Sequence, residues 1–572
     1  MISDEVKDQT WKQVRRGLGF PNVNDPVFTE EGPMKDEIAA IDMKSKQIMV
    51  NEGNLEQRVG ADMLRPVEAH EVMHYKAYPK TLRNYVRLVA YSHAVLDNVE
   101  NAKLVENLFT DLLINTYLFG IGETNIARVY QRLSARREQP SELWDFYIET
   151  FAGMIGKKTS TSSLSEKQRA DAKQLSDILK DSVGNSKEWP TSITEFAKAV
   201  KDYLDKNKGN QGQQSNGSGA SSPQSNGNGN QSQGQNDPSQ QGQTYSGDGN
   251  NSKSDNKQAP PLIDKHDVDD FVPFDRSQAT PDQQKRYFEK ELKGVGAELA
   301  RELGSDDKGK QVYSDVLSGL GIGTSKQAKI WFYRDLVSAY DLKMPNVEST
   351  SGRRRRQNPR KCKLGKFHEA DQHYTLSQYP GFNPLFLYRW NYASGESARP
   401  GRDRPYLLLA PDTSGSMDDP DQTVSYALVS AMIAKKTALR FKSKVAVVNF
   451  STQYLVQDFT ISEEKLDEAL SHYFGGGTNI PGQAIYETVA REKHPSHILI
   501  ISDTSISDLD KEVGYLERAL KACRAGGTIF LSSAPVEETK LLQKIGFDVI
   551  PTRSFSDMDE LTLKKAGEIY TT

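Results

Sequence analysis

The amino-acid sequence predicts a multidomain chain: a mainly α N-terminal domain, a disordered linker, a helical middle segment, and a C-terminal α/β domain with a doubly wound parallel sheet. Three observations support this prediction. The chain has 572 residues, which is more than one hydrophobic core usually organises. A long stretch before residue 262 almost lacks apolar side chains, and short apolar runs alternate with helical patterns after Tyr406. We place the four parts at residues 1–205, 206–260, 261–400 and 401–572.

The N-terminal domain is predicted to be helical because its apolar residues recur at spacings of three and four. Ser165 followed by Gln168 has the pattern of a capping box, which predicts the start of one helix. The other predicted helices cover residues 6–18, 66–78, 81–119, 143–156 and 192–204.

The linker at residues 206–260 consists mostly of Gln, Asn, Ser and Gly, so burial cannot offset the entropy that ordering would cost. A flexible coil of about 55 residues has an end-to-end distance on the order of 40 Å. The middle segment then contains two predicted helices, at residues 286–304 and 326–344. The first follows Thr280, Pro281 and Gln283, which have the pattern of a helix cap.

The C-terminal domain contains short apolar runs separated by helical segments, which is typical of a doubly wound α/β sheet. One predicted helix covers residues 423–441. The predicted strands are residues 406–410, 445–450, 497–502, 528–533 and 547–551.

Composition limits the classes of function. The chain has 73 basic and 77 acidic residues and a net charge of -4, which argues against a polycation that binds nucleic acid or membranes along its whole length. The two cysteines, Cys362 and Cys523, are far apart, which suits a reducing compartment and supports no disulfide framework. No apolar window reaches the length of a membrane span and no leader is recognised, so we expect a cytoplasmic protein.

A basic run begins at Arg353–Arg356 and continues through Arg360 to Lys366. It contains no interleaved aromatic residues that would stack on bases, and short runs of this kind are usually solvated or docking features. We therefore expect neither a nucleic-acid partner nor a membrane partner.

Three loops of the C-terminal domain carry oxygen ligands at strand ends. Asp412, Ser414 and Ser416 follow the first predicted strand, Thr478 precedes a helix, and Asp503 follows the strand at 497–502. Loops at the carboxyl ends of parallel strands converge, and an all-oxygen ligand set suits Mg²⁺. In the alternative interpretation, the domain holds no metal and these residues only cap helices and turns.

The D-x-S-G-S, T and D pattern resembles the metal-ion-dependent adhesion site (MIDAS) of von Willebrand factor A (VWA) domains. The resemblance implies that Ser414, Ser416 and Thr478 coordinate Mg²⁺ directly or nearly so. It also implies that Asp412 and Asp503 act largely through bound water, and that a carboxylate of a protein partner completes the shell. In that family the chemistry is protein binding rather than catalysis.

The N-terminal domain contains a second candidate site, the H-E-x-x-H motif of His70, Glu71 and His74. Residues four apart share a helix face, so both imidazoles can reach one Zn²⁺ while Glu71 acts as general base on a metal-bound water. In the alternative interpretation, these are ordinary helix histidines, since the motif also arises by chance.

A catalytic zinc needs a third protein ligand. Asn107, Asp111 and Asn115 form one stripe of a following helix, and we predict Asp111 as the ligand and Asn115 as a hydrogen-bond partner of a ligating histidine. Glu106 and Glu100 are rival ligands.

These residues look like those of a zincin, and their coupling to an A-type domain resembles the metallopeptidases with a C-terminal von Willebrand-like domain. The resemblance implies a zinc metallopeptidase, a hydrolase whose VWA domain recruits substrate or partner. An aspartate as third ligand departs from the commonest zincin patterns, which use glutamate or histidine. The alternative is a non-catalytic, metal-dependent adaptor that docks a MoxR-type AAA+ ATPase or its client through the VWA metal site.

Overall fold

The computed structural model describes most of the chain, in two compact units, Met1–Ala328 and Lys329–Thr572. Residues 266–328 belong with the N-terminal unit, although the sequence suggested a separate middle segment beginning at 261. The predicted linker at 206–260 lies outside the described residues, except where helix α9 extends to Gly209. The described residues are 2–29, 37–136, 141–157, 163–209, 266–338, 340, 404–503, 506–531, 536–552 and 555–571, with the backbone of 356–361 and 388–392.

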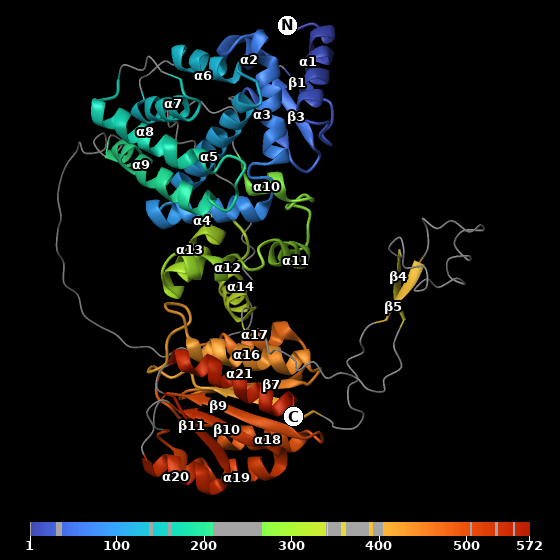
Figure 1. The fold of residues 1–572 in the computed structure, drawn as a ribbon. Helices are drawn as coiled ribbons and strands as arrows, with labels where there is room; N and C mark the ends of the chain where they lie inside the picture. Colours follow the sequence, from blue (N-terminus) through green and yellow to red (C-terminus); the bar gives the residue numbers. More distant parts are fainter. Residues whose placement is uncertain are drawn as a thin grey trace, which may run out of the picture. The chain divides into compact units, whose positions relative to one another are not determined.

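The N-terminal unit is mainly helical, as predicted (Figure 1). Helices α3 and α5 contact each other and carry the candidate metal ligands, and α4 packs on α5. The helices of this unit are α1 (Asp4–Gly17), α2 (Glu52–Arg58), α3 (Leu64–Lys76), α4 (Leu82–Leu96), α5 (Val99–Gly120), α6 (Ile126–Ala135), α7 (Glu142–Met154), α8 (Glu166–Lys180), α9 (Trp189–Gly209), α10 (Val268–Phe271), α11 (Pro281–Glu291), α12 (Val295–Glu302) and α13 (Asp306–Gly319). Helix α14 (Ser325–Ser338) spans the boundary between the units.

Local signals place several helix ends correctly. The capping box of Ser165 and Gln168 opens α8, and Thr280 caps α11, so both predictions are confirmed. Two predicted helices are instead divided. Asp97, in the left-handed conformation at φ 53°, separates α4 from α5, and Gly294 at φ 84° separates α11 from α12. These backbone conformations interrupt helices whose apolar spacing continues across the break.

A small sheet in this unit was not predicted. Its strands are β1 (Val27–Thr29), β2 (Ala39–Asp42) and β3 (Gln47–Asn51), in the order β1-β3-β2. The strands have three to five residues, which is too short for the alternation of apolar and polar side chains to stand out in sequence.

The C-terminal unit contains the predicted α/β sheet. Its six strands are ordered β11-β10-β9-β6-β7-β8, and neighbours pair in parallel except β7 and β8. The antiparallel edge strand β8 was not predicted. The strands are β6 (Tyr406–Pro411), β7 (Val445–Phe450), β8 (Tyr454–Thr460), β9 (Ser496–Ser502), β10 (Arg524–Leu531) and β11 (Phe547–Pro551).

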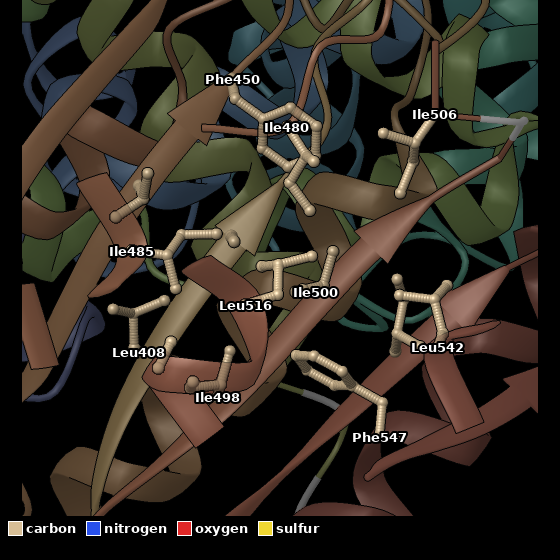
Figure 2. Packing of buried hydrophobic residues seen from close by; sticks show 14 of the residues in the cluster. Leu408, Phe450, Ile480, Ile485, Ile498, Ile500, Ile506, Leu516, Leu542 and Phe547 are labelled. Atoms are coloured by element: carbon tan, nitrogen blue, oxygen red, sulfur yellow. The ribbon is translucent and has the colours of Figure 1, made fainter. Parts of the chain in front are cut away.

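Helices cover both faces of this sheet (Figure 1). One layer contains α16 (Tyr426–Arg440), α17 (Glu463–Leu470) and α21 (Phe555–Thr571), and the other contains α18 (Gly482–Arg491), α19 (Leu509–Cys523) and α20 (Val536–Ile545). Figure 2 shows the core between the sheet and the second layer, where Ile498 and Ile500 of β9 pack with Ile485 and Leu516 of the helices. Two of the loops that carry the candidate Mg²⁺ ligands follow the carboxyl ends of strands β6 and β9.

The backbone of the basic run is described only in part. Strand β4 (Arg356–Lys361) pairs antiparallel with β5 (Tyr388–Tyr392), and the side chains of both lie outside the described residues. Among the helices of the described ranges, none combines the length and the apolar character that a membrane crossing requires.

Candidate metal centres

Helix α3 carries the whole H-E-x-x-H motif, as predicted. The helix is buried over most of its length because apolar residues such as Val67 and Val72 pack on the surrounding helices. His70, Glu71 and His74 are themselves inaccessible to solvent, each with 0% exposure. Burial of three polar side chains on one helix is costly unless other polar groups or a metal compensate them.

Helix α5 supplies the facing polar groups. Asn98 caps its N-terminus by accepting from Asn101 N, and the stripe of Asn107, Asp111 and Asn115 follows at intervals of four residues. All three members of this stripe are buried. The intervals place them one turn apart on the same helix face.

Two imidazoles and one carboxylate meet at a single point. His70 Nε2 lies 3.0 Å from His74 Nε2, and Asp111 Oδ1 lies 3.3 Å and 3.5 Å from these two nitrogens. The three potential ligand atoms all lie within 4.8 Å of one another. Histidine nitrogen and aspartate oxygen are ligands that Zn²⁺ accepts in proteins.

The outer nitrogens of both rings are bound to acceptors. His70 Nδ1 lies 2.9 Å from Asn115 Oδ1, and His74 Nδ1 lies 2.9 Å from the Tyr78 carbonyl oxygen. Because these oxygens accept hydrogen bonds, each Nδ1 carries a proton and donates it. The lone pair of each neutral ring is therefore on Nε2, directed into the shared point beside the Asp111 carboxylate.

The electrostatics of the cluster favour a positive charge at that point. Burial disfavours the charged form of His70, but the Asp111 carboxylate outweighs this and raises the pKa of the ring. Burial alone would raise the pKa of Asp111, yet the two histidines hold it below its usual range. Burial is the main cause of the lowered pKa of His74. The cluster thus favours an ionised carboxylate and a proton or metal cation between the imidazoles.

Position and charge distinguish Asp111 from Glu106 and Glu100, the other two candidates for the third zinc ligand. Asp111 lies with the histidines and is held ionised, whereas burial raises the pKa of Glu106 strongly and favours its neutral form. Glu106 is buried but is not part of the convergent group. Glu100 is exposed, and its carboxylate lies 3.6 Å from Lys103 Nζ. Of the three, Asp111 alone combines the position and the charge that a ligand needs.

Glu71 lies close to this group. It follows His70 directly on α3, and its charge contributes to the raised pKa of His70 and, as the smallest cause, to that of Tyr130 on α6. Tyr147 on α7 is also fully buried nearby, with its ring centroid 5.9 Å from that of Tyr130. Burial raises the pKa of both tyrosines, and the Asp111 charge adds to the effect, so both hydroxyls stay protonated.

Sequence reasoning missed these tyrosines and also His266. The His266 ring lies against His74, with Nε2 2.7 Å from His74 Nδ1. No motif connects His266 to the H-E-x-x-H helix, from which it is separated by more than 190 positions. The sequence alone therefore gave no signal for this contact.

The second candidate centre lies at the strand ends of the C-terminal unit. Asp412 follows β6 and Asp503 follows β9, and these strands are adjacent and parallel at the point where the strand order reverses. Ligands of open α/β sheets bind in the crevice at such a switch point. The structure therefore brings the first and third predicted loops together.

Hydrogen bonds connect the predicted ligands of these two loops. Asp412 Oδ2 accepts from Ser502 Oγ at 2.6 Å, and Asp412 Oδ1 accepts from Ser414 N at 2.8 Å. Ser416 Oγ lies 3.1 Å from Ser414 Oγ and donates to Asp503 Oδ1 at 3.1 Å. Burial raises the pKa of Asp412 despite these hydrogen bonds, and the charge of Asp503 adds to the effect.

A backbone hydrogen bond joins the loop that carries Thr478 to the loop that carries Asp412, Ser414 and Ser416. Gly415 N donates to Gly476 O at 2.7 Å, and a Cβ added at Gly415 would lie 3.2 Å from that oxygen, so a side chain at this position would crowd the neighbouring loop. Thr478 is buried, and its carbonyl accepts from Ser507 N at 2.9 Å. Asp412 and Ser414 are also buried, whereas Ser416 is exposed, so the site is open to solvent on the Ser416 side.

No protein-family model matches this chain, and no curated protein matches it. Among solved structures, a von Willebrand factor type A protein from Catenulispora acidiphila shares 18% identity over 29% of this chain and 43% of that chain, with a TM-score of 0.23. Proximal thread matrix protein 1 of the mussel byssus shares 17% identity over 28% of this chain and 44% of that chain, with a TM-score of 0.21. The chain thus spans less than half of each structure, and the likeness is weak.

Proposed function

We propose that the N-terminal unit is a zinc-dependent metallopeptidase domain of the zincin kind, in which His70, His74 and Asp111 hold the metal. One observation carries the proposal: two imidazole lone pairs and an ionised carboxylate converge on one buried point. Such a convergence of negative potential is stable only around a cation or a proton. Glu71, next to His70 on α3, is a candidate general base, which a purely structural site would not need.

The residues around the cluster have separate roles in the proposed amide hydrolysis. A zinc ion held by His70, His74 and Asp111 would supply Lewis acidity and make the attacking water more acidic. Glu71, adjacent to His70 on α3, would act as the general base that takes a proton from the attacking water and returns it to the leaving amine. Asn115 and the Tyr78 carbonyl keep the proton of each histidine on Nδ1, so that Nε2 faces the metal. The buried Tyr130 hydroxyl, which stays protonated, would be available to donate a hydrogen bond to a substrate oxygen.

Metal analysis of the purified full chain tests the proposal first. We expect about one tightly held zinc per chain after dialysis against a weak chelator, because three protein ligands bind it. Mass spectrometry with inductively coupled plasma measures the zinc directly. A chain that retains no zinc and does not take it up from solution would exclude both the enzyme and any zinc-loaded form.

A second candidate function is favoured by the burial of the site. His70, Glu71, His74 and Asp111 all have 0% exposure, and closed metal sites usually stabilise a fold rather than catalyse a reaction. In this second candidate, the N-terminal unit is a zinc-stabilised scaffold within a non-catalytic adaptor. Retained zinc without hydrolysis of any peptide would favour the adaptor.

We propose further that the C-terminal unit is a VWA domain that binds a protein partner through Mg²⁺. Asp412, Ser414, Ser416, Thr478 and Asp503 would hold the ion, and the exposed Ser416 side of the site would admit an acidic side chain of the partner. An all-oxygen set at the switch point of the sheet supports this assignment. A MoxR-type AAA+ ATPase or its client is the proposed partner.

Replacing Asp412 by alanine is expected to weaken Mg²⁺-dependent capture of that ATPase about 10–100-fold, the usual effect of losing a group that orients metal ligands. Asp412 accepts hydrogen bonds from Ser414 and Ser502, so its loss releases both. Pull-down with the ATPase, with Mg²⁺ and with EDTA, measures the effect. Asp458→Ala, which removes an equal charge from the exposed face of β8, is the matched control. Equal capture by Asp412→Ala and Asp458→Ala would contradict the assignment.

A further inference from the structure

His266 contacts the proposed zinc site from outside. It is the first described residue after the gap at 210–265, and it packs within the N-terminal unit with only 6% exposure. Its ring lies edge-on to that of His74, with centroids 4.3 Å apart and an interplanar angle of 79°. It does not belong to the group of converging ligand atoms, because it faces the Nδ1 side of His74 and not the Nε2 side.

The hydrogen bonds of His74 Nδ1 determine how His266 acts. The Tyr78 carbonyl oxygen, 2.9 Å away, only accepts, so Nδ1 carries the proton. The second neighbour of that proton is His266 Nε2, at 2.7 Å, which must therefore accept. His266 is then a neutral ring protonated on Nδ1, and the His74 proton is shared between two acceptors.

Contacts with α4 and α10 hold the segment around His266 in place beside His74. Tyr85 of α4 donates to the His266 carbonyl oxygen at 3.3 Å and stacks on Phe271 with ring centroids 5.2 Å apart. The His266 ring itself lies 5.7 Å from the Phe271 ring. Asp267 and Asp270 form a capping box that opens α10 directly after His266. The imidazole is thus held against His74 by elements independent of the metal ligands.

We propose that His266 is a positioning residue for the metal ligand His74: by accepting from Nδ1, it keeps the Nε2 lone pair directed at the metal. The inference rests on the proposed zinc site and deepens it. Partners of this kind orient a ligating imidazole and raise its basicity. The site then requires residues from both sides of the predicted linker, since His70, His74 and Asp111 precede it and His266 follows it.

The zinc dissociation constants of two full-length variants, measured by competition with a chromophoric chelator, test the inference. His266→Phe keeps a ring beside Phe271 but removes the acceptor, and we expect it to weaken zinc binding about 10–100-fold. His266→Gln keeps an acceptor oxygen within reach, and we expect its affinity to stay close to that of the unaltered chain. His93→Phe, at another buried histidine of the same unit, is the matched control.

The outcomes are distinguishable. If the unaltered chain binds zinc and His266→Phe binds it equally well, the positioning role is wrong while the zinc site stands. Equal weakening of His266→Phe and His266→Gln would also overturn it, because the acceptor would then not matter. If the unaltered chain binds no zinc, the proposed function fails and the inference fails with it. Should His266→Phe not fold, histidine ¹⁵N spectra of the metal-free chain decide, since a proton on His266 Nε2 contradicts the proposal.

Discussion

Zinc content is expected to fall from about one per chain to a trace when His70 and His74 are both replaced by alanine. The substitutions remove two of the three converging ligand atoms and leave Asp111 alone in a buried site. A single carboxylate cannot hold zinc against a chelator. Metal analysis after chelator dialysis measures the loss, and circular dichroism with thermal melting reports how far the metal supports the fold.

A double variant in the other unit provides the control. His472→Ala with His494→Ala removes the same number of imidazoles from more exposed positions outside the cluster, and we expect it to keep its zinc. Zinc retained by the His70/His74 variant would place the metal elsewhere in the chain. Zinc lost from both variants would show that binding depends on the general histidine content and not on this cluster.

The largest effect on the proposed chemistry is expected for Glu71→Gln, which should slow amide hydrolysis about 10²–10⁴-fold while leaving the zinc content unchanged. Glutamine keeps the size and burial of the side chain but cannot accept a proton from a metal-bound water. Glu71 is not one of the three converging ligands, so the metal should remain. Initial rates on a fluorogenic peptide library, normalised to the zinc content of each preparation, measure the effect.

Glu100→Gln is the matched control, because Glu100 was a rival ligand and its side chain is exposed. We expect it to change neither the rate nor the zinc content. If Glu71→Gln hydrolyses peptides as fast as the unaltered chain, Glu71 is not the general base. Absence of hydrolysis in the unaltered, zinc-loaded chain would favour the adaptor, in which catalysis belongs to a partner.

Features that depend on neighbouring residues were predictable from the sequence. The spacing of four between His70 and His74 required only that residues 64–76 form a helix, and the buried strand β9 could be recognised from its apolar run. The caps of α8 and α11 depend on side chains within three residues of the helix start. Position at a strand end likewise identified Asp412 and Asp503, because parallel strands of one sheet end at the same edge.

Only the tertiary structure distinguished between equivalent candidates. Asp111 and Glu106 are both buried acids on α5, and the choice depends on which one faces His70 and His74 across the helix packing. The sequence likewise could not show which strands pair with β6, or that β8 pairs antiparallel at the edge of the sheet, because such pairing joins separate segments of the chain. His266 is the clearest case, because its contact with His74 spans more than 190 positions and has no sequence motif. Local patterns therefore determined which side chains are available for a site, whereas packing decided which of them meet.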